Sequence, residues 1–68
     1  MNVKLFNYYQ AINGGSRQST AKLLGVRPET LSNKLNQKRG AIFTIKNIAI
    51  LQKEWNLSND DIVNVFCK

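Results

Sequence analysis

The sequence of 68 residues lacks histidine altogether and contains one cysteine, one proline and four acidic residues. The absence of histidine removes the side chain that proteins use most often as a general acid or base. Because Cys67 is the only thiol, the chain can form no internal disulfide and has too few ligands for the usual zinc sites. The sequence also offers no nucleophile–base pair and no phosphate-binding loop. We therefore expect no metal, no cofactor, no small-molecule ligand and no enzymatic activity.

Long hydrophobic stretches are also missing, since no apolar run approaches the roughly 20 residues that span a bilayer. The segment 1–10 lacks the apolar core of a signal peptide. These features predict a cytoplasmic protein that does not enter a membrane. A chain of this length forms one domain, residues 1–68, and buries only about 60% of its unfolded surface.

Positive charge dominates the composition, with ten Lys and Arg against four Asp and Glu and a net charge of +6. The segment 16–39 has a net charge of +5, because it contains Glu29 as its only acid and six basic residues: Arg17, Lys22, Arg27, Lys34, Lys38 and Arg39. The segment 40–68 contains three basic and three acidic residues. Nearly all the excess charge thus lies in one third of the chain, which suits a polyanionic partner.

Apolar residues recur at three- and four-residue spacing, which predicts helices. The first predicted helix covers about residues 2–13 and ends at Gly14-Gly15, since glycine accepts the left-handed conformation that closes a helix. Its apolar face comprises Leu5, Phe6, Tyr9 and Ile12. Ser16 is a natural N-cap for a second helix, residues 17–24. The inward face of that helix comprises Thr20, Ala21 and Leu24.

A third helix is predicted from Pro28, which is favoured at the first helical position, to about Gln37. Leu31 and Leu35 form its buried edge, and the opposite face carries Glu29, Ser32, Asn33 and Asn36. A loop over residues 37–43 leads to Thr44, which can cap a fourth helix over residues 45–55. The apolar stripe of the fourth helix comprises Ile45, Ile48, Leu51 and Trp55. The run of residues 41–45 is also compatible with a strand.

Asn56 ends the fourth helix, and Ser58 with Asp61 three residues later predicts a capping box for a last helix, residues 59–66. The apolar contacts of that helix are expected from Ile62, Val63, Val65 and Phe66. The remaining large aromatic residues, Phe6, Phe43 and Trp55, are assigned to the core with Phe66, whereas Tyr8 lies off the apolar face and is expected to be exposed. The predicted fold is therefore all-α, with five short helices.

The segment of about residues 16–36 carries the features of a helix-turn-helix, in which two helices cross steeply at a tight turn. Ala21 provides the small residue where the helices meet, and Gly25, four positions later, tolerates the backbone angles of the turn. Leu24, Val26 and Leu31 supply the apolar residues around it. An ordinary helical hairpin is the alternative interpretation of the same pattern.

These residues resemble the motif of the phage repressor and Cro group of helix-turn-helix transcriptional regulators. The similar segments are Thr20-Ala21-Lys22, Leu24-Gly25-Val26 and 31–36, and residues 43–66 resemble the tail of short phage regulators. The chain departs from the group at Arg17, where glutamine is common, at Thr20, where an apolar residue is usual, and at Arg27, where Ser or Thr usually caps the second helix. The resemblance implies a lambda-repressor-like fold, transcriptional regulation, operator binding and dimeric action, with the protein bound to the nucleoid.

In a helix-turn-helix the second helix enters the major groove with its N-terminal residues near the base edges. The base-reading candidates are therefore Pro28, Glu29, Ser32 and Asn33. Asn33 can pair with adenine, Glu29 can accept from the cytosine amino group, and Ser32 can contact either base. The phosphate-binding candidates are Arg17, Arg27, Lys34, Asn36, Lys38 and Arg39. We predict that Asn33→Ala loses sequence preference, whereas Arg39→Ala weakens binding to all sequences alike.

One short motif reads only a few base pairs, so a two-fold dimer on paired half-sites is expected. No separate oligomerisation segment follows the motif, which predicts a weak or DNA-induced homodimer, most simply a repressor. Ile50 falls away from the stripe of the fourth helix and is expected either to form an exposed dimerisation patch with Ile42 or Val65 or to be an isolated exposed isoleucine. Two alternative functions stay open at this point: an antitoxin or accessory DNA-binding protein of a two-gene system, and a protein-binding adaptor with the same fold.

Overall fold

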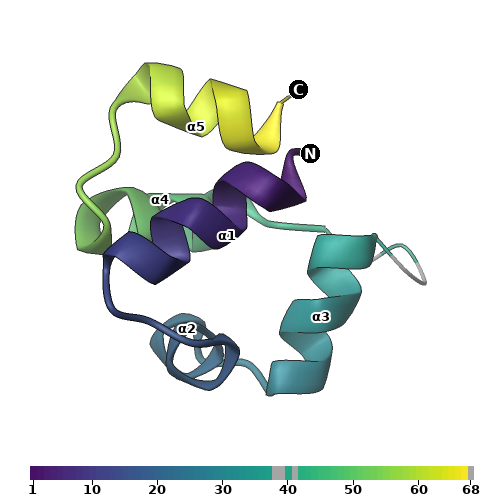
Figure 1. Cartoon of the computed structure of the whole chain (residues 1–68). Coiled ribbons are helices and arrows are strands. Elements are labelled where there is room, and N and C mark those ends of the chain that lie inside the picture. Colours follow the sequence, from purple (N-terminus) through teal and green to yellow (C-terminus); the bar gives the residue numbers. More distant parts are fainter. Residues whose placement is uncertain (38–39, 41, 68) are drawn as a thin grey trace.

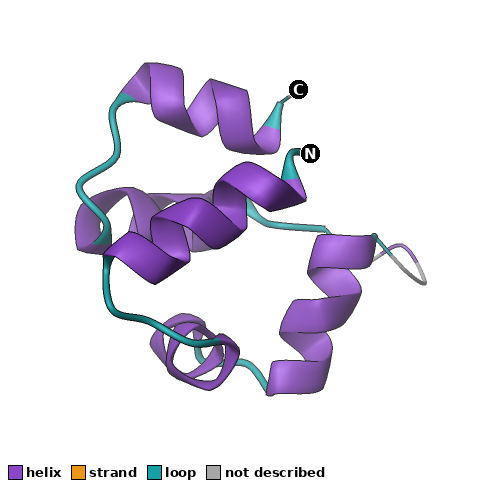
Figure 2. Cartoon of the chain, in the orientation of Figure 1, coloured by secondary structure: helices purple, strands orange, loops and turns teal. Residues whose placement is uncertain are grey.

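The computed structural model describes residues 1–37, 40 and 42–67, and within these residues it contains five helices and no strand (Figures 1 and 2). The helices are α1 (Val3–Ile12), α2 (Arg17–Leu24), α3 (Pro28–Asn36), α4 (Ile45–Glu54) and α5 (Asn59–Phe66). The predicted all-α class and helix positions are confirmed. The strand considered for 41–45 is wrong for the described part, because Ile42–Thr44 has no regular structure and Ile45 begins α4.

Short-range side-chain hydrogen bonds fix where most of the helices begin. The side chains of Ser16, Thr44 and Ser58 each accept a hydrogen bond from the backbone N–H three residues later. In all three cases the side chain of that third residue accepts from the capping backbone N–H in return, which completes a capping box. These contacts confirm the helix starts expected from the sequence.

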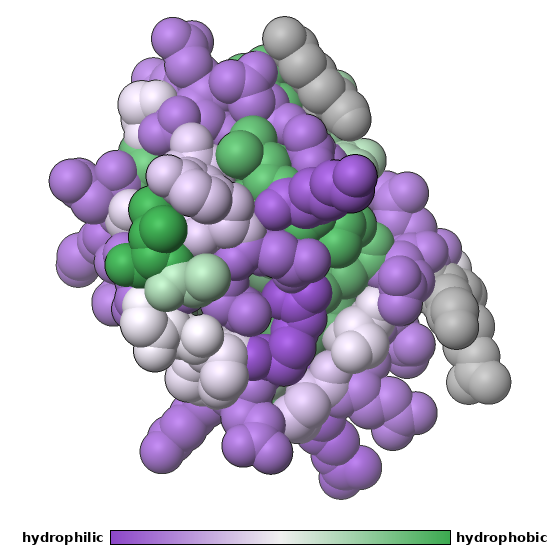
Figure 3. Space-filling view, viewed as in Figure 1, coloured by the Kyte–Doolittle hydropathy of each residue, from purple (hydrophilic) through white to green (hydrophobic). Residues whose placement is uncertain are grey.

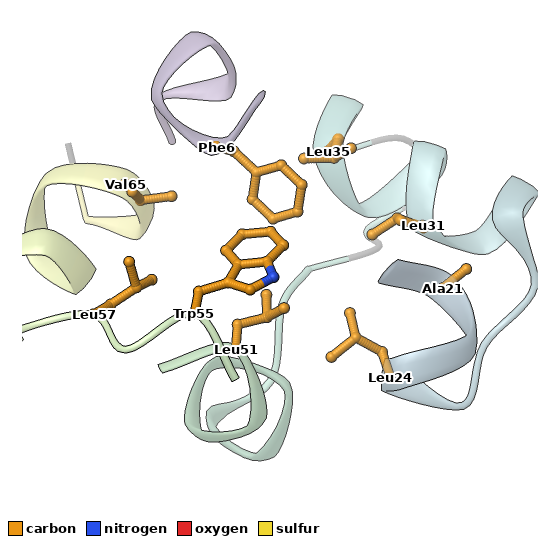
Figure 4. Packing of buried hydrophobic residues seen from close by; sticks show 9 residues of the cluster. All are labelled: Phe6, Ala21, Leu24, Leu31, Leu35, Leu51, Trp55, Leu57 and Val65. Atoms are coloured by element: carbon orange, nitrogen blue, oxygen red, sulfur yellow. The ribbon is translucent and has the colours of Figure 1, made fainter. Parts of the chain in front are cut away.

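The core lies where all five helices meet, and its centre is the ring of Phe6, which is completely buried (Figure 4). This ring lies 5.1 Å from the centroid of Trp55, 5.6 Å from Phe43 and 6.3 Å from Phe66. Edge-on and tilted aromatic packing of this kind stabilises a core beyond the area it buries. The assignment of the four aromatic residues to the core is confirmed, and Tyr8 is exposed as expected.

The two chain ends are joined through α1 and α5, which pack against each other (Figure 1). The backbone N–H of Asn2 donates to the carbonyl of Val65 at 2.7 Å, and the hydroxyl of Tyr9 donates to Asp61 Oδ1 at 2.9 Å. The hydrogen bond with Asp61 and burial raise the pKa of Tyr9. The backbone N–H of Ser58 and the hydroxyl of Tyr9 lower the pKa of Asp61. Among the described residues, no helix has the length and apolar character needed to cross a bilayer.

Three apolar positions differ from the expected helix faces. Ile12, at the end of α1, is 59% exposed, and Val63 of α5 is 43% exposed. Ile45 was expected in the inward stripe of α4 but is 87% exposed, whereas Asn47 is buried. The capping box explains this exchange, because Asn47 Oδ1 accepts from the N–H of Thr44 at 3.1 Å, so burial of its amide is compensated.

The patch suggested around Ile50 is also wrong. Ile50 is partly buried and packs against the core, and Val65 retains only 2% of its exposure. Ile42 alone of the three is exposed, at 60%. Helical spacing places Ile50 within one turn of Asn47 and Leu51, whose side chains point inward, so α4 is rotated relative to the stripe expected from the sequence.

Candidate nucleic-acid interface

Helices α2 and α3 pack against each other and are joined by the three residues Gly25, Val26 and Arg27. Gly25 has φ +71°, and its N–H donates to the carbonyl of Lys22 while the N–H of Val26 donates to that of Ala21. This pair of hydrogen bonds is the Schellman motif that ends helices at a left-handed residue. Figure 1 shows α2 end-on and α3 lying in the plane of the view, so the two axes cross steeply. The turn predicted at Gly25 is confirmed.

Buried residues hold this helix pair on the rest of the molecule. On α2, the exposed fraction of Ala21 is 1% and that of Leu24 is 8%. On α3, the exposed fraction of Leu31 is 0% and that of Leu35 is 5%. Figure 4 shows Leu24, Leu31 and Leu35 directed toward the same core as Leu51 of α4, and Ala21 directed toward α3. Because Leu31 and Leu35 are one helical turn apart, they fix which face of α3 points inward. The inward residues predicted for both helices are confirmed.

The outward face of α3 is polar. Glu29, Ser32 and Asn36 are exposed and lie at i, i+3 and i+7 on the side of the helix away from Leu31 and Leu35. Asn33 lies at the edge of this face and is partly buried. In Figure 3, the visible lower part of the molecule, where α2 and α3 lie, is hydrophilic to neutral. A straight row of polar side chains on a well-anchored helix can form hydrogen bonds to an external partner.

The N-terminal end of α3 has open surroundings. Pro28, at its first position, and Arg27, at the N-cap position, are both exposed, and Arg27 provides no side-chain cap. Because Pro28 has no N–H, only the N–H groups of Glu29 and Thr30 lack a side-chain oxygen from the N-cap residue, and the carboxylate of Glu29 lies in the same turn. Near the other end, Lys34 Nζ donates to the carbonyl of Ile42 at 2.8 Å and ties α3 to the segment before α4. Lys38 and Arg39, which the sequence proposes as phosphate ligands, lie outside the described residues.

Arg17, the first residue of α2, is held by α1 rather than pointing freely outward. Its guanidinium donates to Gln10 Oε1 at 3.0 Å and to Asn7 Oδ1, and its Cζ lies 5.4 Å from the centre of the Phe6 ring. Partial burial lowers the pKa of Arg17, and a guanidinium stays protonated in proteins. Both acceptors are uncharged amides, so they orient the positive charge without neutralising it.

Asn7 and Gln10 are contributors to this region that the sequence did not reveal. Gln10 Oε1 also accepts from Thr20 Oγ1 at 3.0 Å, and the side chain of Thr20 is buried. One amide of α1 therefore satisfies two donors of α2. The only signal in the sequence is that Asn7 and Gln10 lie three residues apart beside Phe6, and that signal identifies no partner.

The described residues contain no group of three or more His, Cys, Asp and Glu side chains that could hold a metal ion, and no cavity was found among them. Comparison of the chain with protein-family models, with curated proteins and with solved structures gives no match. The surface of α2 and α3 and its charge are therefore the features that bear on function.

Proposed function

We propose that the protein binds duplex DNA with α2 and α3 as a helix-turn-helix, α3 being the helix that enters the major groove. The observation that carries the proposal is the polar face of α3, anchored from behind by Leu31 and Leu35 and located in the segment with a net charge of +5. A duplex presents a dense row of phosphates around a groove that admits one helix. The steep crossing of α2 and α3 supports the same interpretation, because it leaves α3 projecting beside its supporting helix.

The base-reading residues in this proposal are Pro28, Glu29, Ser32 and Asn33, near the N-terminal end of α3. The phosphate-binding residues are Arg17, Arg27, Lys34, Asn36, Lys38 and Arg39. Arg17 suits this role because its contacts with Asn7 and Gln10 leave further N–H groups of its guanidinium available. Such a division gives affinity to the phosphate contacts and sequence preference to the base contacts.

We further propose that the protein is a transcriptional regulator of the phage repressor and Cro group, a repressor that binds paired half-sites as two copies. One copy of α3 spans few base pairs, so two copies are needed to specify an operator. An antitoxin or accessory DNA-binding protein of a two-gene system would use the same surface. Binding of the protein encoded by the second gene would distinguish that function from a repressor that acts alone.

The test begins with selection of bound duplexes from a random pool, followed by gel shifts on the selected and on random duplexes at several salt concentrations. Asn33→Ala should weaken binding to the selected sequence by about 5- to 150-fold, corresponding to the 1–3 kcal/mol of a bidentate base contact, and leave random DNA unchanged. Arg27→Ala should weaken both and reduce the log–log salt slope by about 0.9.

Lys4→Ala is the matched control, because Lys4 is an exposed lysine on α1 and belongs to neither helix of the proposed interface. It removes the same charge as Arg27→Ala but should leave the salt slope unchanged. A protein-binding adaptor would bind random duplexes weakly, with little dependence on salt. That result, or an equal loss for Arg27→Ala and Lys4→Ala, would contradict the proposed interface.

A further inference from the structure

Gln10 lies at the centre of a polar network that joins α1 to α2. Its Oε1 accepts one hydrogen bond from the guanidinium of Arg17 at 3.0 Å and another from the hydroxyl of Thr20 at 3.0 Å. The exposed fraction of Thr20 is only 2%, so its hydroxyl depends on Gln10 for an acceptor. Because a guanidinium only donates, the oxygen of the Gln10 amide, and not its nitrogen, must face Arg17. Two donors therefore hold this amide in one orientation.

The guanidinium of Arg17 is fixed on two further sides. Asn7 Oδ1, one turn before Gln10 on α1, accepts a second hydrogen bond from it. The ring of Phe6 lies beneath it, with 5.4 Å between Cζ and the ring centre, a distance at which a cation is attracted to an aromatic face. Phe6 is completely buried, so the core fixes the place of its ring. Two amides and one ring thus give the Arg17 side chain a defined position.

The loop between α1 and α2 closes against the main chain of Gln10. The N–H of Gly15 donates to the carbonyl of Gln10 at 3.0 Å. A Cβ at Gly15 would lie 3.3 Å from that carbonyl oxygen, which is closer than side chains normally pack. Gly15 is not among the residues with positive φ, so close approach rather than backbone freedom accounts for glycine at this position. This approach brings Arg17, at the start of α2, within reach of Gln10.

The partners of Arg17 carry no charge. The two hydrogen-bond acceptors are amides, and none of the described carboxylates bonds to the guanidinium. The position of Arg17 is therefore fixed while its positive charge is kept. A ligand for an anionic phosphate benefits from both properties, because a positioned side chain loses less freedom on binding and an unpaired cation keeps its attraction.

We propose that Gln10 is a positioning residue for DNA binding, whose neutral amide holds the guanidinium of Arg17 ready for a phosphate of the duplex without neutralising it. The inference rests on the proposed function, because it takes a DNA phosphate as the ligand of Arg17. It gives α1 a part in an interface that α2 and α3 form. The two contributions of Gln10, fixing the position and sparing the charge, can be tested separately.

Two replacements of Gln10 separate these contributions. Gln10→Glu keeps the shape of the side chain and an acceptor for Thr20, but it places a carboxylate against Arg17. Gln10→Met removes the acceptor and is combined with Thr20→Val, so that no buried hydroxyl is left without a partner. Thr20→Val alone is the matched control for the double variant, because it retains the bond between Gln10 and Arg17. Far-UV circular dichroism establishes that each variant is folded.

The control for the change in charge is Gln52→Glu. It makes the same chemical replacement on α4, where the amide of Gln52 donates to Asn59 of α5 at 2.9 Å. Gln52 belongs to neither helix of the proposed interface. Arg17→Gln completes the set and measures what the guanidinium itself contributes to DNA binding.

In the arm without DNA, the mobility of the Arg17 Nε–H group is measured by the ¹H–¹⁵N heteronuclear NOE. We expect values close to those of helical backbone amides in wild type and in Thr20→Val. In the double variant Gln10→Met/Thr20→Val the value should fall to that of Arg27, which is exposed and makes no side-chain cap. A mobile Arg17 in wild type, or an equally rigid one in the double variant, would overturn the positioning role.

In the arm with DNA, gel shifts on a random duplex are recorded at several salt concentrations. Gln10→Glu should reduce the log–log salt slope by about 0.9 and weaken binding about eightfold at 0.1 M salt, because a neutralised Arg17 displaces one counterion fewer. Arg17→Gln should give the same reduction, and Gln52→Glu should leave the slope unchanged. The double variant should keep the slope but bind about 2- to 12-fold more weakly than Thr20→Val, because a mobile side chain must be ordered on binding.

The outcomes distinguish this inference from the proposed function. Absence of salt-dependent binding by the wild-type protein would contradict the proposed function, and the inference with it. If the wild type binds and Gln10→Glu keeps the full slope, the role of Gln10 alone is overturned. An unchanged slope in Arg17→Gln, or an equal reduction in Gln52→Glu, would also overturn it, because the effect would then not act through Arg17.

Discussion

Replacing Gly25 by the two mirror-image forms of alanine separates backbone conformation from packing at the turn between α2 and α3. Gly25 has φ +71°, and no heavy atom outside its immediate neighbours lies within 4 Å of the position that a Cβ would take. Space is therefore available for the Cβ of L-alanine, and only the left-handed backbone disfavours an L-residue. That conformation costs an L-residue about 1–2 kcal/mol and suits a D-residue.

Both alanines also lose the extra freedom that glycine has in the unfolded chain, which stabilises each variant by about 0.4–1 kcal/mol. This contribution cancels when the two variants are compared. The free energy of unfolding of Gly25→D-Ala should therefore exceed that of Gly25→Ala by about 1–2 kcal/mol, with wild type between them. In a domain of this size, each kcal/mol corresponds to about 4–8 °C in Tm.

The assay is urea and thermal unfolding of chemically synthesised chains, followed by far-UV circular dichroism. Gly14 has φ +69° and equally open surroundings at the end of α1, so the same exchange there should give a difference of the same sign. Equal destabilisation by L- and D-alanine at Gly25 would refute the argument, because it would mean that a contact, and not the backbone angle, requires glycine.

Four further predictions concern stability. The pKa of Asp61 is lowered below its ordinary value of 3.8, so its contribution is present above that pH and is lost as the pH falls through the folded-state value; acid titration of Asp61→Asn should lack this loss. The pKa of Tyr9 is raised above 10.0, so its contribution is lost as the pH rises through the higher folded-state value, and Tyr9→Phe should flatten that alkaline limb. Gln10→Ala leaves the buried hydroxyl of Thr20 without its acceptor and should cost about 1–3 kcal/mol in urea unfolding, more than Thr20→Val. Phe6→Ala should cost about 3–5 kcal/mol, comparable to the whole stability of a small domain, so its circular dichroism at 25 °C should show a largely unfolded chain.

The helix boundaries could be predicted because the signals that set them act over three or four residues. Ser16, Thr44 and Ser58 each cap the helix that follows through a partner three positions away. Gly25 and Asn56 end helices by adopting positive φ, a conformation that those residue types tolerate. Local chemistry of this kind is fully visible in the sequence.

Exposure at the helix ends could not be predicted in the same way, because it depends on how each helix is rotated against its neighbours. Apolar spacing favoured Ile45 as an inward residue of α4, yet Asn47 takes the buried position once its amide is bonded to Thr44. At the candidate site, Leu31 and Leu35 correctly predicted the outward face of α3. The hydrogen bonds from Arg17 to Gln10 and Asn7 connect two helices across seven and ten positions of the sequence. No local sequence pattern predicts such contacts.

The attachment of α3 at three points determines the precision with which it can serve as the proposed recognition helix. The turn at Gly25 sets where α3 begins, Leu31 and Leu35 set its rotation, and the bond from Lys34 to the carbonyl of Ile42 fixes it near its end. Reading bases requires side chains held to within a fraction of an ångström, and a helix attached at one end only would lose that precision.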